Sequence, residues 1–219
     1  MTWALNSCFL TLAVLLVWQM EELAEACSCV PAHPQQAFCN ADVVIRAKVV
    51  GKEDIKVDNN IYGSLVTHFK YNVKQIKMFK GPSQNIDAIY TPSLSSVCGV
   101  TLKTNGQEYL ITGRLNDDGK MHISLCNFIE HWEALTATQQ KNLVQRYETG
   151  CDCKINRCTS IPCVIGGPAE CLWTDWIVEK TARGNQAKHF SCIKRSDESC
   201  AWYRGAEPPK KDFLDIEDP

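Results

Sequence analysis

The stretch Ala24–Pro34, AEACSCVPAHP, governs how the rest of the chain is interpreted, because two cysteines one residue apart follow directly on an apolar leader. Within that leader the apolar run Cys8–Trp18 is too short to cross a hydrocarbon core of roughly 30 Å. The residues Ala-Glu-Ala at 24–26 give the small-x-small pattern that signal peptidase cleaves. A lipoprotein signal is disfavoured because it has Leu where this chain has Ala24. We expect residues 1–26 to be a secretory signal peptide, although they contain no Lys or Arg.

Cleavage after Ala26 would make Cys27 the N-terminal residue and would give an even number of cysteines. The full chain has 13 Cys, and Cys8 would leave with the leader. An even count in a secreted chain indicates disulfide bonds with no free thiol. The remaining chain would carry 23 basic and 22 acidic residues, because three Glu lie in the leader. This near-neutral balance implies no nucleic-acid partner.

The remaining cysteines divide evenly, with six up to Cys151 and six from Cys153 onward. We therefore expect two domains, 27–151 and 152–219, each able to close its own disulfides. The second is so short that its apolar core would be marginal without such bridges.

Alternation of apolar and polar residues predicts β-strands in the first domain. The inward set is Val43, Ile45, Ala47, Val49, Met121, Ile123 and Leu125. In residues 66–80, VTHFKYNVKQIKMFK, the apolar positions change from odd to even numbers, which predicts a β-bulge near Lys74 and Gln75.

Two helices are predicted beside these strands, over Pro34–Asn40 and Thr136–Tyr147. The second has the capping box Thr136 and Gln139, with Gly150 as its stop. Its apolar stripe is Leu143, Val144 and Tyr147. A mainly β fold with flanking helices favours a five-stranded OB-like barrel, although periodicity alone leaves other small β-folds open.

The second domain is expected to be small and rich in disulfides. Cys158 and Cys163 are close enough in sequence for a local bridge, and the bulky core candidates are Trp173, Trp176, Trp202 and Tyr203. The chain ends in KKDFLDIEDP, where acidic and apolar residues mix. This tail fits either solvated disorder or an acidic docking arm.

No enzyme motif is present: the chain has no H-E-x-x-H, G-x-S-x-G or P-loop pattern, and its five His are scattered. Lysines 70, 74, 77 and 80 are expected to form a solvated face rather than a polyanion site.

The pairs Cys27/Cys29 and Cys151/Cys153 could bind metal, but in an oxidising compartment disulfides are favoured. With its thiol in a bridge, an N-terminal Cys27 would still offer an α-amine and a carbonyl, which can chelate zinc as a five-membered ring.

Several segments resemble the tissue inhibitors of metalloproteinases across the whole chain after residue 26. They are CSCVPAHPQQAFCNADVVIRAKVV, YNVKQIKMFKG, SSVCGV, CxCxxxxCxxxPC, ECLWTDW and IKRSDxSCAWYRG. Residues 35–38, residues 61–63, the acidic tail and the lack of an N-x-S/T sequon are similar to the type-2 branch of that family. The chain departs from the branch at Val30 and in Gly51–Asn60.

The resemblance implies a secreted, extracellular inhibitor of matrix metalloproteinases, not an enzyme, with a netrin-type OB-like inhibitory domain. Cys27 would chelate the protease's zinc through its amine and carbonyl, and the protein would have no cofactor of its own. Ser28 would enter the specificity pocket, and Cys29, Val30 and Pro31 would follow the cleft. A second edge would be formed by Ser95, Ser96, Val97 and Cys98.

The resemblance also implies six bridges and further partners. The bridges are Cys27–Cys98, Cys29–Cys126, Cys39–Cys151, Cys153–Cys200, Cys158–Cys163 and Cys171–Cys192. Tyr62 would contact membrane-type enzymes, and the C-terminal domain would dock the haemopexin-like domain of progelatinase A. The docking residues would be Phe213, Leu214, Asp215, Ile216, Glu217 and Asp218. We expect a monomer that binds no nucleic acid and does not insert into membranes.

Two other functional classes stay open. A netrin-like binding module without inhibitory activity would share the barrel and the bridges but would have residues before the first cysteine. A secreted receptor ligand could also coexist with inhibition.

Overall fold

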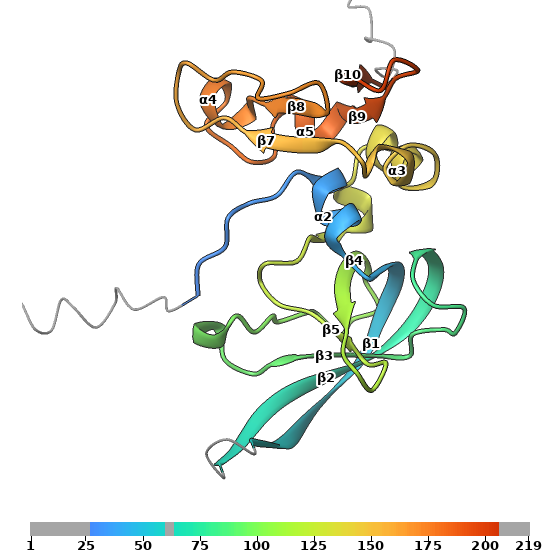
Figure 1. Ribbon diagram of the computed structural model, residues 1–219. Coiled ribbons are helices and arrows are strands. Elements are labelled where there is room, and N and C mark those ends of the chain that lie inside the picture. Colours follow the sequence, from blue (N-terminus) through green and yellow to red (C-terminus); the bar gives the residue numbers. More distant parts are fainter. Residues whose placement is uncertain (1–26, 60–63, 206–219) are drawn as a thin grey trace, which may run out of the picture.

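The computed structural model describes residues 27–59 and 64–205, and Figure 1 shows their arrangement. The expected leader, Tyr62 and residues 206–219 lie outside the described residues, so what we expect of them stays a prediction. The first half of the chain forms a β-barrel. The second half packs at the end of the barrel that carries helices α2 (Pro34–Asn40) and α3 (Ala137–Gln145) (Figure 1).

Six strands form one sheet that closes on itself. They are β1 (Val43–Asn59), β2 (Ser64–Lys80), β3 (Ala88–Pro92), β4 (Glu108–Leu115), β5 (Met121–His122) and β6 (Ile129–His131). Their order is β1-β2-β3-β5-β4, and β4 pairs back with β1. Strands β3 and β5 are parallel, and β6 pairs with β4. A closed, mainly antiparallel ring of five strands is an OB-type barrel, so the predicted fold class is confirmed.

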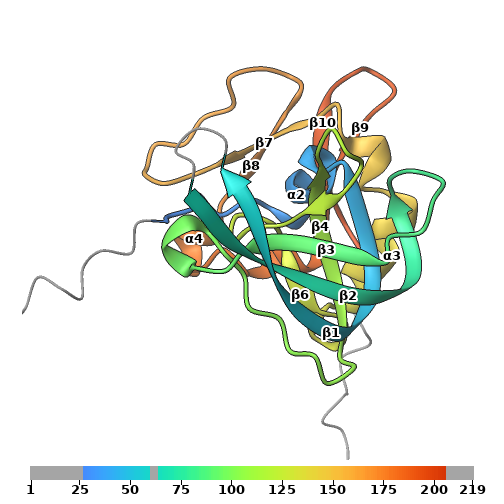
Figure 2. The ribbon, with the colours of Figure 1, turned by 90° about the horizontal axis from the view of Figure 1, so that it is seen from below.

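The hairpin of β1 and β2 is long and strongly curved, as Figure 2 shows from below. Its pairing skips Ile76, because Arg46 pairs with Lys77 and the next residue of β1 pairs with Gln75. This extra residue makes a β-bulge, and the Ile76 side chain is 43% exposed. The bulge expected near residues 74–75 is therefore confirmed, one residue further along.

The barrel interior contains the alternating residues of β1, all fully buried. A second apolar cluster lies between the barrel and the helices, and it takes Val44 from the opposite face of β1. The prediction is wrong for one residue of the expected inward set. Leu125 is 50% exposed, because β5 ends at His122 and the chain turns away from the sheet.

Helix α2 has the predicted bounds, and α3 has the predicted capping box between Thr136 and Gln139. Two expectations for α3 are wrong. Val144 is 60% exposed, so the stripe buries only Leu143 and the following Tyr147. The helix ends at Gln145, and Gly150 is the last residue of a separate 3-10 turn, η3 (Glu148–Gly150).

The second half contains two small sheets and two short helices. The elements are β7 (Lys154–Arg157), β8 (Glu170–Trp173), α4 (Asp175–Val178), α5 (Asn185–His189), β9 (Phe190–Lys194) and β10 (Cys200–Arg204). Strands β7 and β8 are parallel, and β9 and β10 antiparallel. The core is built around three half-cystines and a partly buried Trp202. Trp173 is buried, but Trp176 and Tyr203 are 42% and 38% exposed, so placing those two in the core was wrong.

Six disulfides connect the twelve cysteines of the described chain, with the pairing that the family resemblance implied. They are Cys27–Cys98, Cys29–Cys126, Cys39–Cys151, Cys153–Cys200, Cys158–Cys163 and Cys171–Cys192. No bridge crosses the domain boundary expected after residue 151. The division of the chain into two domains at this point stays a prediction.

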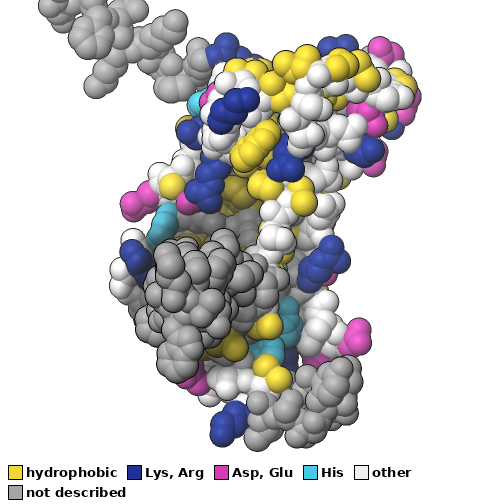
Figure 3. Space-filling view, turned by 90° about the vertical axis from the view of Figure 1, so that its left-hand side faces the viewer, with side chains coloured by type: hydrophobic (Ala, Val, Ile, Leu, Met, Phe, Trp, Pro, Cys, Tyr) yellow, Lys and Arg dark blue, Asp and Glu magenta, His cyan; other side chains and the backbone are white. Residues whose placement is uncertain are grey.

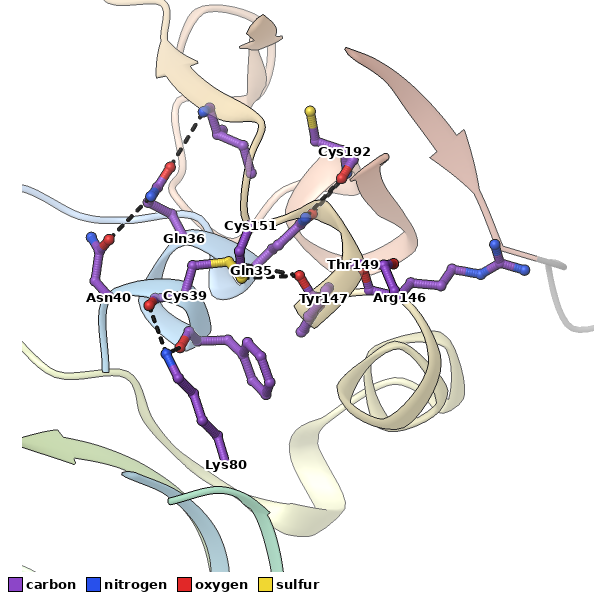
Figure 4. The surroundings of a disulfide bond; sticks show 12 residues. Gln35, Gln36, Cys39, Asn40, Lys80, Arg146, Tyr147, Thr149, Cys151 and Cys192 are labelled. Atoms are coloured by element: carbon purple, nitrogen blue, oxygen red, sulfur yellow. Dashed lines mark hydrogen bonds between the residues drawn. A yellow bond between two sulfur atoms is a disulfide. The ribbon is translucent and has the colours of Figure 1, made fainter. Parts of the chain in front are cut away.

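Polar contacts join the two halves around the Cys39–Cys151 bridge (Figure 4). The Gln35 side chain accepts from the Cys192 backbone N–H and donates to the Cys192 carbonyl, both at 2.7 Å and both buried. Gly150 is required beside them, because a Cβ there would overlap the Cys192 carbonyl oxygen.

Lys80 donates to the carbonyl oxygens of Phe38 and Cys39, at 3.4 and 2.8 Å. It thus satisfies the last turn of α2 rather than lying on a solvated face.

In the described ranges, 27–59 and 64–205, no helix has the length and apolar character needed to cross a bilayer.

His33 links the N-terminal segment to the second half and is the N-cap of α2. Its Nδ1 accepts from the Gln35 backbone N–H at 3.2 Å, and its Nε2 lies 3.2 Å from the Gln186 carbonyl oxygen. Nε2 therefore carries the proton. The ring meets Trp173 edge-on at 5.5 Å. Burial lowers the pKa of His33 to about 4, although the Gln186 carbonyl and Asp175 favour the protonated form.

This depressed pKa predicts a loss of stability on acidification. Between pH 6.5 and 4 the unfolded chain takes up a proton at His33 that the folded chain does not, so stability falls as the pH falls. The loss by pH 4 should be about 3 kcal/mol. Urea unfolding with intact disulfides, repeated across this range, measures it. His33→Asn keeps an N-cap acceptor without titrating, so its stability should vary less with pH. The same pH slope in both proteins would contradict the assignment.

Candidate functional site

The first described residues, 27–32, form an extended segment that runs along one side of the molecule into α2 (Figure 1). Ser28, Pro31 and Ala32 are exposed, and Val30 is 78% exposed. Among the residues that the structure describes, none forms a hydrogen bond with the backbone of 27–32. Its N–H and C=O groups are therefore free to pair with a partner.

Two disulfides hold this segment in place. Cys27 is bonded to Cys98 and Cys29 to Cys126, with Cα–Cα distances of 5.3 and 5.2 Å. The four sulfur atoms lie within 4.8 Å of one another, but each belongs to a bridge, so none is available as a thiolate metal ligand. The side chains that alternate with these cysteines, Ser28 and Val30, therefore point away from the bridges.

A second exposed segment lies beside the first. It is the 3-10 turn η1 (Ser95–Val97), which Figure 1 shows next to the start of the described chain. Cys98 ends the turn in the left-handed conformation, with φ 63° and ψ 23°, and its N–H donates to the Ser95 carbonyl at 3.0 Å. The Cys98 carbonyl accepts from the N–H of Leu125, the residue before Cys126, at 2.9 Å, so the chain segments that carry the two bridge partners are joined by a backbone hydrogen bond. We call residues 27–31 together with 95–98 the N-terminal ridge.

The N-terminal ridge carries no ionisable side chain. Its exposed apolar side chains are Val30, at 78%, Val97, at 53%, and Pro31. A partner would therefore recognise this surface through its shape and its backbone groups rather than through charge. Figure 3 faces this side of the molecule and shows hydrophobic side chains around a hollow.

The structure brings nine of the predicted site residues together on this ridge: Cys27, Ser28, Cys29, Val30, Pro31, Ser95, Ser96, Val97 and Cys98. Tyr62 and residues 213–218 lie outside the described part of the chain. Sequence reasoning missed Leu94, which is 62% exposed directly before η1, and the exposed position of Leu125 next to Cys126. Leu94 could have been recognised as a lone apolar residue in a serine-rich turn.

Gly99 allows the chain to turn back under η1. Its N–H donates to the Leu94 carbonyl at 2.9 Å. A Cβ at Gly99 would lie 2.7 Å from that carbonyl oxygen and closer still to the carbonyl oxygen of Pro92. Both obstacles are backbone atoms, so they cannot move away as a flexible side chain would.

Gly99→Ala should therefore displace η1 and lower the free energy of unfolding by about 2–4 kcal/mol, in the range of overpacked or strained sites. Gly167→Ala is the matched control, because a Cβ there meets nothing within 4 Å. The measurement is denaturant unfolding of both variants with disulfides intact. Equal stability of the two variants would show that η1 does not depend on this close approach.

Comparison with known proteins identifies the family of this chain. The family model described as "Tissue inhibitor of metalloproteinase" matches residues 25–202. The chain is 59% identical over 211 residues to metalloproteinase inhibitor 2 of Cavia porcellus and to that of Homo sapiens, covering 96% of each chain. It is 58% identical over 217 residues to metalloproteinase inhibitor 2 of Gallus gallus, covering 99% of this chain and 98% of the relative. The chain belongs to the tissue inhibitor of metalloproteinase family.

Proposed function

We propose that this chain is a secreted protein inhibitor of zinc metalloendopeptidases, the matrix metalloproteinases, and that the N-terminal ridge enters the protease cleft. The observation that carries the proposal is the ridge itself: two exposed, uncharged segments are crosslinked to each other, and the backbone of one forms no hydrogen bond with any described residue. Such a segment can occupy a cleft in the manner of a substrate strand.

Cys27 is the proposed zinc ligand. Its thiol is committed to Cys98, so its α-amine and carbonyl are the groups left for the metal once the bond after Ala26 has been cut. An α-amine has a pKa of roughly 7.7–8.0, so a useful fraction is neutral at extracellular pH. A catalytic zinc with three protein ligands keeps one position for water, and an inhibitor that takes this position removes the attacking water. The zinc belongs to the protease, and the inhibitor holds no cofactor of its own.

The remaining ridge residues would set the fit to each protease. Ser28 would point into the specificity pocket, Cys29–Pro31 would follow the cleft, and Ser95–Val97 would contact its rim. Because the bridges already hold these residues, little conformational entropy is lost on binding, which favours tight inhibition from a modest area.

One additional alanine before Cys27 tests the chelate directly. The extension converts the α-amine into an amide and adds bulk next to the metal. Inhibition should weaken at least about a hundredfold, equivalent to about 2.7 kcal/mol, while the unfolding free energy stays unchanged. The assay is inhibition of a panel of zinc metalloproteinases, with the correctly processed protein as control. Undiminished inhibition by the extended protein would exclude the chelate.

Two more specific binding partners follow from the type-2 resemblance and belong to the same proposal. Tyr62 would contact membrane-type metalloproteinases. The C-terminal domain and residues Phe213–Asp218 would dock the haemopexin-like domain of progelatinase A.

Deleting Phe213–Pro219 should leave inhibition of the active site intact and weaken progelatinase A binding about tenfold or more. Surface plasmon resonance with the proenzyme measures the second effect, and an inhibition assay with a free catalytic domain measures the first. A companion variant with Asp215→Asn, Glu217→Gln and Asp218→Asn separates charge from apolar contact. Equal affinity for the proenzyme with and without the tail would show that residues 213–219 do not take part in docking.

A netrin-like binding module or receptor ligand without inhibitory activity is the alternative. N-terminal sequencing of the secreted protein separates the two, because the chelate needs Cys27 as the first residue.

A further inference from the structure

A hollow of about 480 Å³ lies between the N-terminal ridge and the second half of the chain. One wall is the segment Cys29–Ala32, and the opposite wall is formed by Ala182, Arg183, Ala187 and Lys188. The floor comes from α2, from the 125–128 loop and from the start of α3. Figure 3 shows a hollow lined by hydrophobic side chains on this face. Its volume falls in the range of roughly 300–1,000 Å³ that is typical of small-molecule sites, and such sites favour boundaries between packed units.

The lining mixes apolar and polar groups, with a small excess of apolar surface. It includes Val30, Pro31, Ala37, Phe128 and Leu135. The Gln139 amide also faces the hollow, but it is already used, since its oxygen accepts from the Thr136 N–H and its nitrogen donates to the Ala187 carbonyl. A bound molecule would therefore meet slightly more apolar than polar surface.

Within the described residues, the charged groups of the hollow leave one cation without an ion-pair partner. Glu130 and Arg183 pair with each other at 2.7 Å. Lys188 lines the same hollow and forms no ion pair with any residue of the described chain. The three charges therefore sum to one positive charge, and a ligand with an apolar body and one negative charge would complement them.

We propose that this hollow binds a medium-chain fatty carboxylate, with its alkyl chain against Val30, Phe128 and Leu135 and its carboxylate at Lys188. The hollow shares Cys29, Val30 and Pro31 with the proposed protease contacts. Its test uses a small probe and no protease, so its outcome is independent of the proposed function.

The experiment follows the fluorescence of 1-anilinonaphthalene-8-sulfonate, an apolar anion, with the full-length secreted protein. We expect saturable binding at one site and displacement by decanoate, with 1-decanol at least about tenfold weaker because it lacks the charge. Lys188→Glu should weaken the probe at least about tenfold, whereas Lys141→Glu, an exposed lysine of α3 outside the hollow, should leave it unchanged.

Ala134→Phe provides a second variant that does not depend on charge. Ala134 is exposed in the 3-10 turn η2 (Trp132–Ala134) and lines the hollow, so a phenyl ring there fills space without disturbing the core. Probe binding should be lost while the circular dichroism spectrum is kept. Binding that survives both Lys188→Glu and Ala134→Phe would overturn the proposal, as would equal weakening by Lys141→Glu. Binding that appears only after deletion of residues 206–219 would assign the hollow to the chain's own end and would also overturn it.

Discussion

Two disulfides, rather than packing, determine where the first residues of the described chain lie. Residues 27–32 form no backbone hydrogen bond with the described remainder, so Cys27–Cys98 and Cys29–Cys126 supply the attachment. These bridges join residues 71 and 97 positions apart, and the chain-entropy model assigns about 4–5 kcal/mol to a loop of either length. Because the disulfides attach this segment to the barrel, the side chains between the cysteines need not be buried. They stay available to a partner.

The same segment is fixed at its other end by buried polar contacts. The His33 ring accepts from the Gln35 N–H and lies within hydrogen-bond distance of the Gln186 carbonyl oxygen of α5. The Gln35 side chain bonds both the N–H and the carbonyl of Cys192 in β9. A buried polar group left without its partner costs about 1–3 kcal/mol, so these contacts are specific as well as stabilising. The covalent end does not respond to pH, whereas the polar end depends on a neutral His33. Acid therefore acts on the join between the two halves before it acts on the ridge.

Features that are local in sequence could be predicted from sequence, and features that depend on a distant surface could not. The capping box of Thr136 and Gln139, the buried alternation of β1 and the bulge beside Gln75 are each determined by neighbouring residues. Val144 and Trp176 are apolar yet exposed, which the local sequence does not reveal. Gly150 was interpreted as a helix stop, but it is needed for the approach of Cys192, which is remote in the chain. The bridge pairing came from the family resemblance, since six cysteines in each half allow fifteen pairings.

Residues 29–31 belong to the proposed protease contacts and also line the hollow, and this has a thermodynamic consequence. The floor of that hollow includes Phe128 and Leu135. Two ligands that contact one short segment are coupled whenever either changes the position or freedom of that segment. Linkage then requires the coupling to be reciprocal: a carboxylate that strengthens protease binding must itself bind more tightly in the complex, by the same factor. Because the bridges already restrict the segment, little freedom remains for either ligand to remove, so such coupling would arise mainly from a shift in position.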